Sequence, residues 1–196
     1  MKKVSLLLIT AASIIGAMLI YGYFNKHQVD NNTTKNNNND YPLVENSIIV
    51  NKSIDEINLL FNKKSGVVFL CIKENEWCNH YAKHLNDLLK ENEISEISYL
   101  NIKQDRQYNT SGYRKLVDNL KDYLLKDDEN NLKIFVPTVI FIKDGNIIGY
   151  DNETSIITEN ISPDEYYTEE KIIELRNKLI NFINDYKEEE LWFGNM

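Results

Sequence analysis

Apolar and polar positions fall into blocks along this chain, and each block predicts one element. The first block is an uncharged run from Val4 to Phe24, which follows Lys2 and Lys3. A helix of about 20 apolar residues is long enough to cross a bilayer, so residues 1–24 predict a single membrane anchor. The lysines favour the cytoplasmic side, which places the remaining chain outside the cytoplasm. A cleaved signal peptide is the alternative, but the run lacks a small-x-small site at its end.

The next block, residues 25–46, is polar and rich in asparagine. Such a segment has too little apolar surface to form a core, so we expect a disordered tether. The patterned region, residues 47–190, then predicts one folded domain, and residues 191–196 a short tail. The tail contains Trp192 and Phe193, for which the sequence suggests packing on the domain or contact with a partner.

The first half of the domain predicts two helices and two strands. Ser53 followed by Glu56 has the pattern of a capping box at a helix start. Residues 66–72 are apolar nearly throughout, as in a central strand that is covered on both faces. A helix is expected after Cys78, with Tyr81, Leu85, Leu88 and Leu89 on one face, and then a strand at 97–102.

The second half begins with a polar stretch, 103–112, which we interpret as a loop. A helix over 113–124 follows, and then a solvated connector at 126–131. An Asp-Gly turn joins two apolar runs, Val139–Ile142 and Ile147–Tyr150, and predicts a hairpin. Residues 151–167 show no clear period. The last helix is expected from about Thr168, with an apolar stripe that extends to Tyr186.

Composition narrows the function classes. The 196 residues carry a formal charge of −8, and 42% of them are hydrophobic. About 150 residues outside the N-terminal segments are enough for one domain with a core. The acidic balance argues against nucleic acid as a partner, because phosphate binding needs clustered Lys and Arg. No motif points to a nucleotide, a haem or a flavin, so we expect no cofactor.

Cysteine chemistry is limited to Cys71 and Cys78, seven positions apart. In a protein outside the cytoplasm, two cysteines suggest a disulfide. Such a bond needs Cα atoms within about 7 Å of each other. Three interpretations stay open: a structural disulfide, a redox-active pair, and two separate thiols, of which Cys71 would be a buried one.

His80 and His84 lie four positions apart on the helix after Cys78, and so share a face. Together with a cysteine they form a candidate set of ligands for a soft transition metal. Two partly exposed helix histidines without a metal are the favoured interpretation, and we assign no metal site.

Two short segments taken together resemble the thioredoxin superfamily. Trp77-Cys78 follows an apolar strand, and Val136-Pro137-Thr138 opens a later one. The element order and the late hairpin agree with this α/β fold, a mixed sheet flanked by helices. The chain looks most like the extracytoplasmic, membrane-associated members, some of which are called bacteriocin-transport accessory proteins or disulfide isomerases.

The resemblance implies a site. Pro137 would follow a cis peptide bond and line a substrate groove with Trp77, Val136 and Thr138. The backbone of Val136 would bind an extended peptide. Cys78 would be the catalytic thiol, and Cys71 a candidate partner for it.

The chain departs from the family's Cys-x-x-Cys motif. If Trp77-Cys78 is the usual opening, Cys78 is the nucleophile and Tyr81 replaces the second cysteine. The spacing from the strand favours another frame, in which Asn75 replaces the nucleophile and Cys78 takes the second, more buried position. A buried acidic residue that thioredoxins often keep in the central strand is also missing here.

We therefore expect a single-pass protein of the cell membrane whose thioredoxin-like domain faces outward. The first hypothesis is thiol–disulfide exchange or isomerisation on exported proteins or peptides that contain cysteines. The second is a redox-inactive module that binds an exported partner in the groove. The third, with the least support, is metal delivery.

Overall fold

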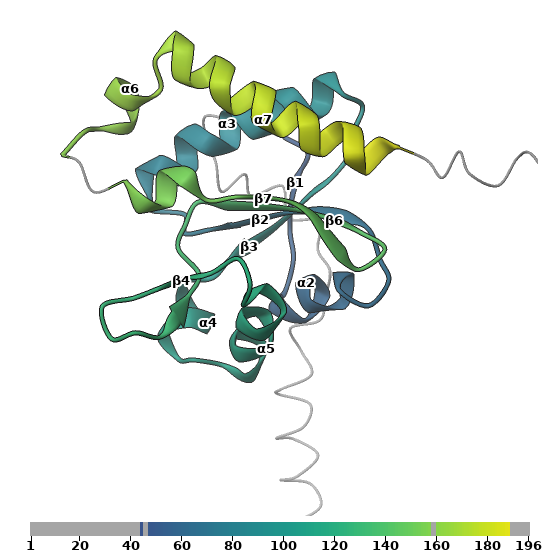
Figure 1. The fold of residues 1–196 in the computed structure, drawn as a ribbon, viewed down its shortest axis with the longest axis vertical. Coiled ribbons are helices and arrows are strands. Elements are labelled where there is room, and N and C mark those ends of the chain that lie inside the picture. The colour runs from purple at the N-terminus through teal and green to yellow at the C-terminus, as the bar shows by residue number, and fades with distance from the viewer. Residues whose placement is uncertain (1–43, 45–46, 158–159, 189–196) are drawn as a thin grey trace, which may run out of the picture. The chain divides into compact units, whose positions relative to one another are not determined.

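A mixed five-stranded sheet forms the centre of the fold in this computed structural model (Figure 1). The structure describes Val44 and residues 47–157 and 160–188. The strands of the sheet are β1 (Ile49–Asn51), β2 (Gly66–Cys71), β3 (Ile97–Asn101), β6 (Thr138–Lys143) and β7 (Asn146–Asp151). Their spatial order is β1-β3-β2-β6-β7, in which β3 is parallel to β1 and β2, and β6 is antiparallel to β2 and β7.

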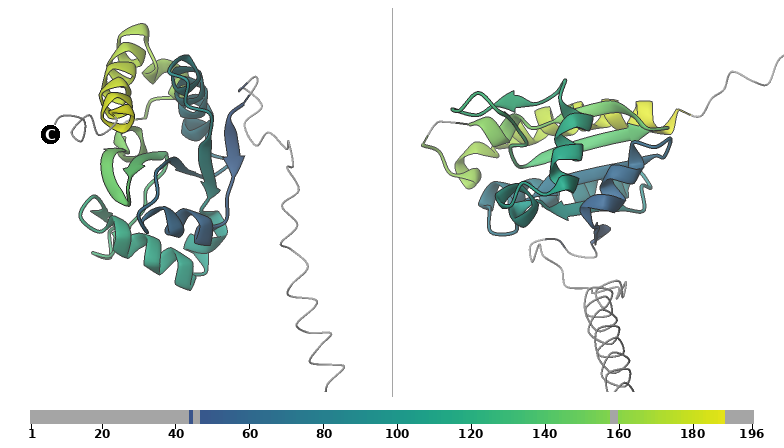
Figure 2. Two further views of the ribbon diagram at one scale, coloured as in Figure 1. Left: turned by 90° about the vertical axis from the view of Figure 1, so that its right-hand side faces the viewer. Right: turned by 90° about the horizontal axis from the view of Figure 1, so that it is seen from below.

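Helices cover both faces of the sheet (Figures 1 and 2). One face carries two long helices, α3 (Glu76–Glu91) and α7 (Glu169–Lys187). The opposite face carries α2 (Ile54–Leu60), α4 (Lys103–Gln107) and α5 (Ser111–Leu120). Three small elements complete the described part: the hairpin of β4 (Leu125–Lys126) and β5 (Leu132–Lys133), the turn of 3-10 helix η1 (Glu153–Ile156), and α6 (Pro163–Tyr166).

Strand β2 lies in the middle of the sheet and divides the core between its two faces. Val67, Phe69 and Cys71 belong to the cluster beneath α3 and α7. Val68 and Leu70 belong to the cluster beneath α2 and α5. All five side chains are buried, which confirms the prediction of a central strand covered on both faces.

Several elements follow their local sequence signals. Ser53 and Glu56 form both hydrogen bonds of a capping box at the start of α2. The Asp144-Gly145 turn joins β6 and β7 as the predicted hairpin, and Gly145 has a φ of +82°, which favours glycine. Thr168 caps α7 by accepting a hydrogen bond from the N–H of Lys171.

Other predictions of local structure were wrong. The stretch 103–112, interpreted as a loop, contains α4 and the start of α5, whose N-cap is Thr110. No described side chain of α4 is buried, so this helix has no apolar stripe by which the sequence could reveal it. The connector 126–131 contains Lys126, the last residue of β4, and the turn that joins β4 to its partner β5. Strand β1 was not predicted, because it has only three residues.

The predicted membrane helix, residues 1–24, lies outside the described residues, as do most of the linker at 25–46 and the tail at 191–196. Val44 is the exception within the linker: it is 2% exposed and belongs to the core, so the folded region begins before residue 47. Within the described ranges, no helix is long and apolar enough to cross a membrane.

Candidate functional site

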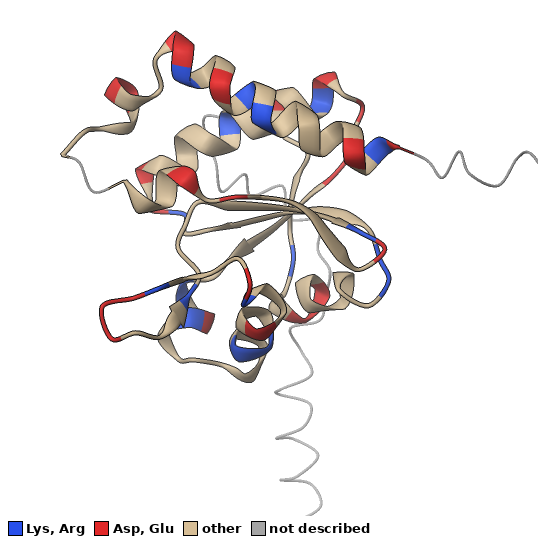
Figure 3. Cartoon of the chain, viewed as in Figure 1, with Lys and Arg blue, Asp and Glu red and all other residues tan. Residues whose placement is uncertain are grey.

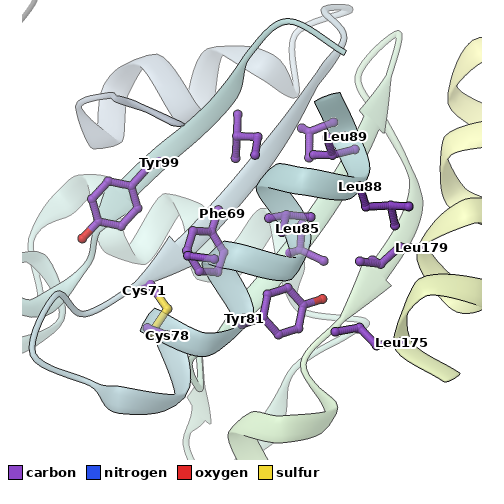
Figure 4. Close-up of a cluster of buried hydrophobic side chains, with 14 of the residues drawn as sticks. Phe69, Cys71, Cys78, Tyr81, Leu85, Leu88, Leu89, Tyr99, Leu175 and Leu179 are labelled. Carbon is purple, nitrogen blue, oxygen red and sulfur yellow. A yellow bond between two sulfur atoms is a disulfide. The ribbon is translucent and has the colours of Figure 1, made fainter. Parts of the chain in front are cut away.

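A disulfide joins Cys71, the last residue of β2, to Cys78 in the first turn of α3 (Figure 4). The two Cα atoms are 6.0 Å apart. Both residues are 0% exposed and lie at one end of the cluster that contains Phe69 and Tyr81. The interpretation of two separate thiols is therefore wrong for this structure, and the linked pair is held within the core.

The loop between the two cysteines is shaped by the start of α3. Asn75 is the N-cap, and its side-chain oxygen accepts a hydrogen bond of 3.2 Å from the N–H of Cys78. The N–H of Ile72 approaches Cys78 Sγ at 3.5 Å. The helix thus begins at Glu76, two residues before Cys78 rather than after it. This arrangement corresponds to the frame in which Asn75 takes the position of the nucleophile.

Pro137 directly precedes β6, which pairs with β2, the strand that ends at Cys71. The Val136–Pro137 peptide bond is cis, as the resemblance implied. Thr138 pairs with Leu70, the neighbour of Cys71, so the Pro137 segment and the disulfide lie at the same edge of the sheet. Pro137 and Thr138 are both buried, and Thr138 Oγ1 donates a hydrogen bond of 2.6 Å to the carbonyl of Phe135.

Val136 differs from the two residues that follow it because it is only half-buried. Its side chain packs against both core clusters. Its backbone N–H and C=O have no hydrogen-bond partner among the residues that the structure describes. The backbone N–H and C=O of Val136 can therefore form hydrogen bonds with a ligand.

Trp77 is half-buried, and part of its surface is taken up within the chain. Its ring lies 5.3 Å from the ring of Tyr166 and 6.1 Å from that of Tyr167. These tyrosines belong to or follow α6, in the stretch 151–167 for which the sequence predicted no element. Tyr167 stacks on His80 as well, with the two rings 6.0 Å apart and nearly parallel. The sequence predicted Trp77 as a groove residue but missed the tyrosines that pack on it.

The two histidines of α3 face this aromatic cluster and not the disulfide sulfur. His80 Nε2 lies 3.4 Å from a carboxylate oxygen of Asp164, and the ring of His84 lies 5.2 Å from that of Tyr167. Burial and the neighbouring Lys83 lower the pKa of His84. The described part of the chain has no group of three or more metal-ligating side chains, and Cys78 is already bonded. These positions give no support to metal delivery.

A buried polar network beside the disulfide was not anticipated. Asp151, 4% exposed at the end of β7, accepts a hydrogen bond of 2.7 Å from Tyr81 and one of 3.0 Å from Lys178. Burial raises the pKa of Tyr81 strongly, and the charge of Asp151 raises it further. Burial opposes the charge of Lys178, but its hydrogen bonds to Glu153 and Asp151 raise its pKa. Tyr81 therefore links α3 to β7 through its hydrogen bond to Asp151.

The network extends to the exposed side through Glu153. Its carboxylate accepts a hydrogen bond from Lys178, which lowers the pKa of Glu153. No local sequence signal indicates this network, because Asp151 follows the predicted strand and its partners Tyr81 and Lys178 come from α3 and α7, far away in the sequence. The contacts of the network tie together four elements, α3, β7, η1 and α7.

The fold and the site together define a mixed α/β domain with a covalent link between its central strand and the first turn of the following helix. No family model matches the sequence, and no curated protein matches it. Among solved structures, thioredoxin O2 from Arabidopsis thaliana in its oxidised state is similar, with a TM-score of 0.41 and 13% identity. The match covers 70% of this chain and 96% of that one. A similarity at this level supports no inference about activity.

Proposed function

We propose that this chain is a membrane-anchored protein whose thioredoxin-like domain faces outward and binds an extended segment of an exported protein. In this proposal the Cys71–Cys78 disulfide is structural. The observation that supports it most directly is the complete burial of both cysteines, each 0% exposed. Exchange requires a thiolate to attack one sulfur of the bond, and no such approach is open here.

The start of α3 gives a second reason. A reactive cysteine is expected where backbone N–H groups at a helix start stabilise the thiolate. Here the N-cap is Asn75, whose amide oxygen already accepts from the N–H of Cys78. The sequence has two cysteines, and in this structure they are bonded to each other, so a reactive thiol is present only after this bond has been opened.

The edge at Val136 is the proposed binding surface. Its free backbone N–H and C=O can pair with an extended peptide in the way that a strand is added to a sheet. Buried Pro137 and Thr138 fix the position of this segment against β2. Because main-chain pairing is independent of side chains, the edge sets the conformation of the partner, and neighbouring surfaces select its sequence.

Thiol–disulfide exchange remains a second candidate, and one observation favours it. Cys78 lies in the first turn of α3, where a thiolate that formed on reduction would be stabilised. Its cycle would begin with attack by a substrate thiolate on Cys78 or Cys71, which releases the other cysteine as a thiolate. The first turn of α3 would have to open for this step, because both sulfurs are covered.

Differential alkylation separates these two functions. Full-length protein is treated with dithiothreitol and iodoacetamide in its native state, and the modified cysteines are identified by mass spectrometry. A structural disulfide predicts no labelling of Cys71 or Cys78 until a denaturant is added. Rapid native labelling of Cys78, or its recovery in mixed disulfides from cells, would establish exchange and contradict the structural role.

Binding at Val136 is tested with a rhodamine-labelled extended peptide, Thr-Val-Glu-Val-Glu-Val-Glu-Thr, and an analogue with N-methyl groups on alternate amides. The methyl groups remove main-chain donors and leave the side chains unchanged. We expect fluorescence anisotropy to show binding of the first peptide and a loss of about tenfold for the methylated one, since the hydrogen bond to the Val136 carbonyl is removed. Equal binding of both peptides would rule out main-chain pairing.

Anchoring rests on the apolar run from Val4 to Phe24, and orientation on Lys2 and Lys3. Full-length protein should sediment with membranes, and removal of residues 1–24 should leave it in the supernatant. Protease added outside intact cells should degrade the domain. Full-length protein found free in the medium would contradict the anchor.

A further inference from the structure

Basic side chains gather around a hollow of about 1000 Å³ between α4, α5 and the β4–β5 hairpin. Four cations line it, namely Lys103, Arg106, Arg114 and Lys133, against two carboxylates, Asp127 and Glu129. Figure 3 shows basic positions on α4, on α5 and at the hairpin, whose turn is acidic. In a chain with a net charge of −8, a hollow with an excess of cations is a local reversal of sign.

Three of these cations have no carboxylate partner in the described part of the chain. The guanidinium of Arg106 donates to the carbonyl of Ile134 at 3.4 Å, and that of Arg114 to the carbonyl of Asn109. The ammonium of Lys133 lies 5.5 Å from the centre of the Phe135 ring. Only Lys103 forms an ion pair, with Glu74 at 3.3 Å. Guanidinium groups with unused N–H donors match the geometry of carboxylates.

One of the two carboxylates that line the hollow is engaged within the hairpin. Asp127 Oδ1 accepts hydrogen bonds from the N–H groups of Glu129 and Asn131, so it holds the hairpin turn together. The lining includes an exposed apolar side chain as well, Leu132, which is 37% exposed. A partner with both acidic and apolar side chains would meet complementary groups here.

The hollow and the proposed binding edge are close together along the chain. Lys133 lines it, Ile134 is held by Arg106 and by the hydroxyl of Tyr113 at 3.4 Å, and Val136 follows two residues later. Three residues of extended chain span about 10 Å. A peptide of six to eight residues, about 20–26 Å long, is therefore long enough to reach from Val136 across the hollow.

We propose that this hollow selects acidic segments, so that the extended partner bound at Val136 carries Glu or Asp residues alternating with apolar ones. The inference rests on the proposed function, because it assigns a partner class to the same edge. Repulsion from the remaining negative charge of the protein does not prevent this binding, since salt screens exposed charges beyond about 8–10 Å. Ion pairs between the peptide carboxylates and the cations of the hollow would form over distances shorter than this screening length.

The test compares the Glu peptide introduced above with a peptide that has Gln at the same three positions, using full-length protein in a neutral detergent. We expect the Glu peptide to bind about tenfold more tightly, as several exposed charge-assisted contacts would give. Raising the salt concentration should weaken its binding and leave the Gln peptide unaffected. Equal affinity for the two peptides would overturn the proposal.

Two double variants with the same net charge provide the control. Arg114→Gln with Lys133→Gln should abolish the preference for Glu. Lys83→Gln with Lys90→Gln removes two exposed cations from α3 and should keep it. Equal weakening in both variants would show a non-specific effect of net charge and overturn the proposal. If Arg114→Gln fails to fold, Lys133→Gln alone takes its place, because no hydrogen bond from its ammonium is recorded among the described residues.

Two outcomes separate this inference from the proposed function. A Glu preference that survives N-methylation of the peptide would support the hollow and contradict pairing at Val136. Loss of binding on methylation, together with equal binding of the Glu and Gln peptides, would support pairing at Val136 and contradict selection by the hollow. Tighter binding of inorganic tripolyphosphate than of the Glu peptide would identify a phosphate site and overturn the acidic-peptide proposal.

Discussion

At the scale of single residues, the position of Cys78 decides how the chemistry of this domain is interpreted. Its N–H is capped by Asn75 and its sulfur is bonded to Cys71, so both groups that a reactive cysteine would use are already occupied. The same residue that made exchange the first hypothesis is thus one half of a covalent link in the core. Sequence spacing alone allowed both roles.

The contribution of this link to stability is testable. A bond between residues seven positions apart closes a small loop, and the chain-entropy model gives about 2–3 kcal/mol for it. We expect Cys71→Ala with Cys78→Ala to lower the free energy of unfolding by at least this amount, as measured by urea denaturation. Wild-type protein unfolded and refolded in reductant should show a similar loss. An unchanged midpoint in both would mean that the disulfide does not stabilise the fold.

At the scale of elements, the close packing of α7 on β7 depends on one residue without a side chain. A Cβ placed at Gly149 would lie 2.8 Å from Cβ of Phe182 and still closer to its Cγ. The ring of Phe182 in turn packs on Phe141 of β6, with the ring centres 5.7 Å apart. Helix and strands are therefore in contact at a point where one added methyl group has no room.

Gly149→Ala is expected to destabilise the domain by about 1–3 kcal/mol, because α7 must shift to relieve the overlap. Gly66→Ala is the matched control, since a Cβ there would meet the side chain of Leu60 at an ordinary 3.4 Å. Thermal unfolding of the two variants provides the comparison. Equal melting temperatures would contradict the tight packing of α7 described here.

Elements with a strong local pattern could be predicted from the sequence, whereas elements held by distant contacts could not. The capping box at Ser53 and the Asp144-Gly145 turn are encoded within a few residues, and both are confirmed. Helix α4 is polar on all sides, and α6 has four residues, so neither shows a period. The site follows the same rule: the cis bond at Pro137 was implied by a motif, but the pairing of Cys71 with Cys78 depends on how β2 and α3 meet.

At the scale of the whole molecule, charge is distributed unevenly over an acidic protein. The basic hollow lies on the side of α4 and α5, while the histidines and the network of Asp151 lie on the side of α3 and α7. The two sides therefore respond to different conditions. Salt acts on the proposed peptide contacts, and pH acts on the stability of the aromatic cluster around Tyr167.

The direction of the pH effect follows from His84. Burial lowers its pKa below the ordinary 6.5, so the folded state favours the neutral ring. Below about pH 6.5 the unfolded chain binds a proton more readily than the folded one, and the free energy of unfolding falls until the folded pKa is passed. We expect His84→Gln to flatten this slope below about pH 6.5 in denaturant titrations. An identical slope in the variant would assign the effect to other groups.

The link between Cys71 and Cys78 also determines what happens when the chain is cut. Lys73 and Glu74 are exposed in the loop between the two cysteines, at a position where trypsin can cleave after the lysine. A single cut there would leave two fragments that stay joined through sulfur. Such a nicked protein would migrate as one band on a gel without reductant and as two bands with it, so the gel would report the linkage directly.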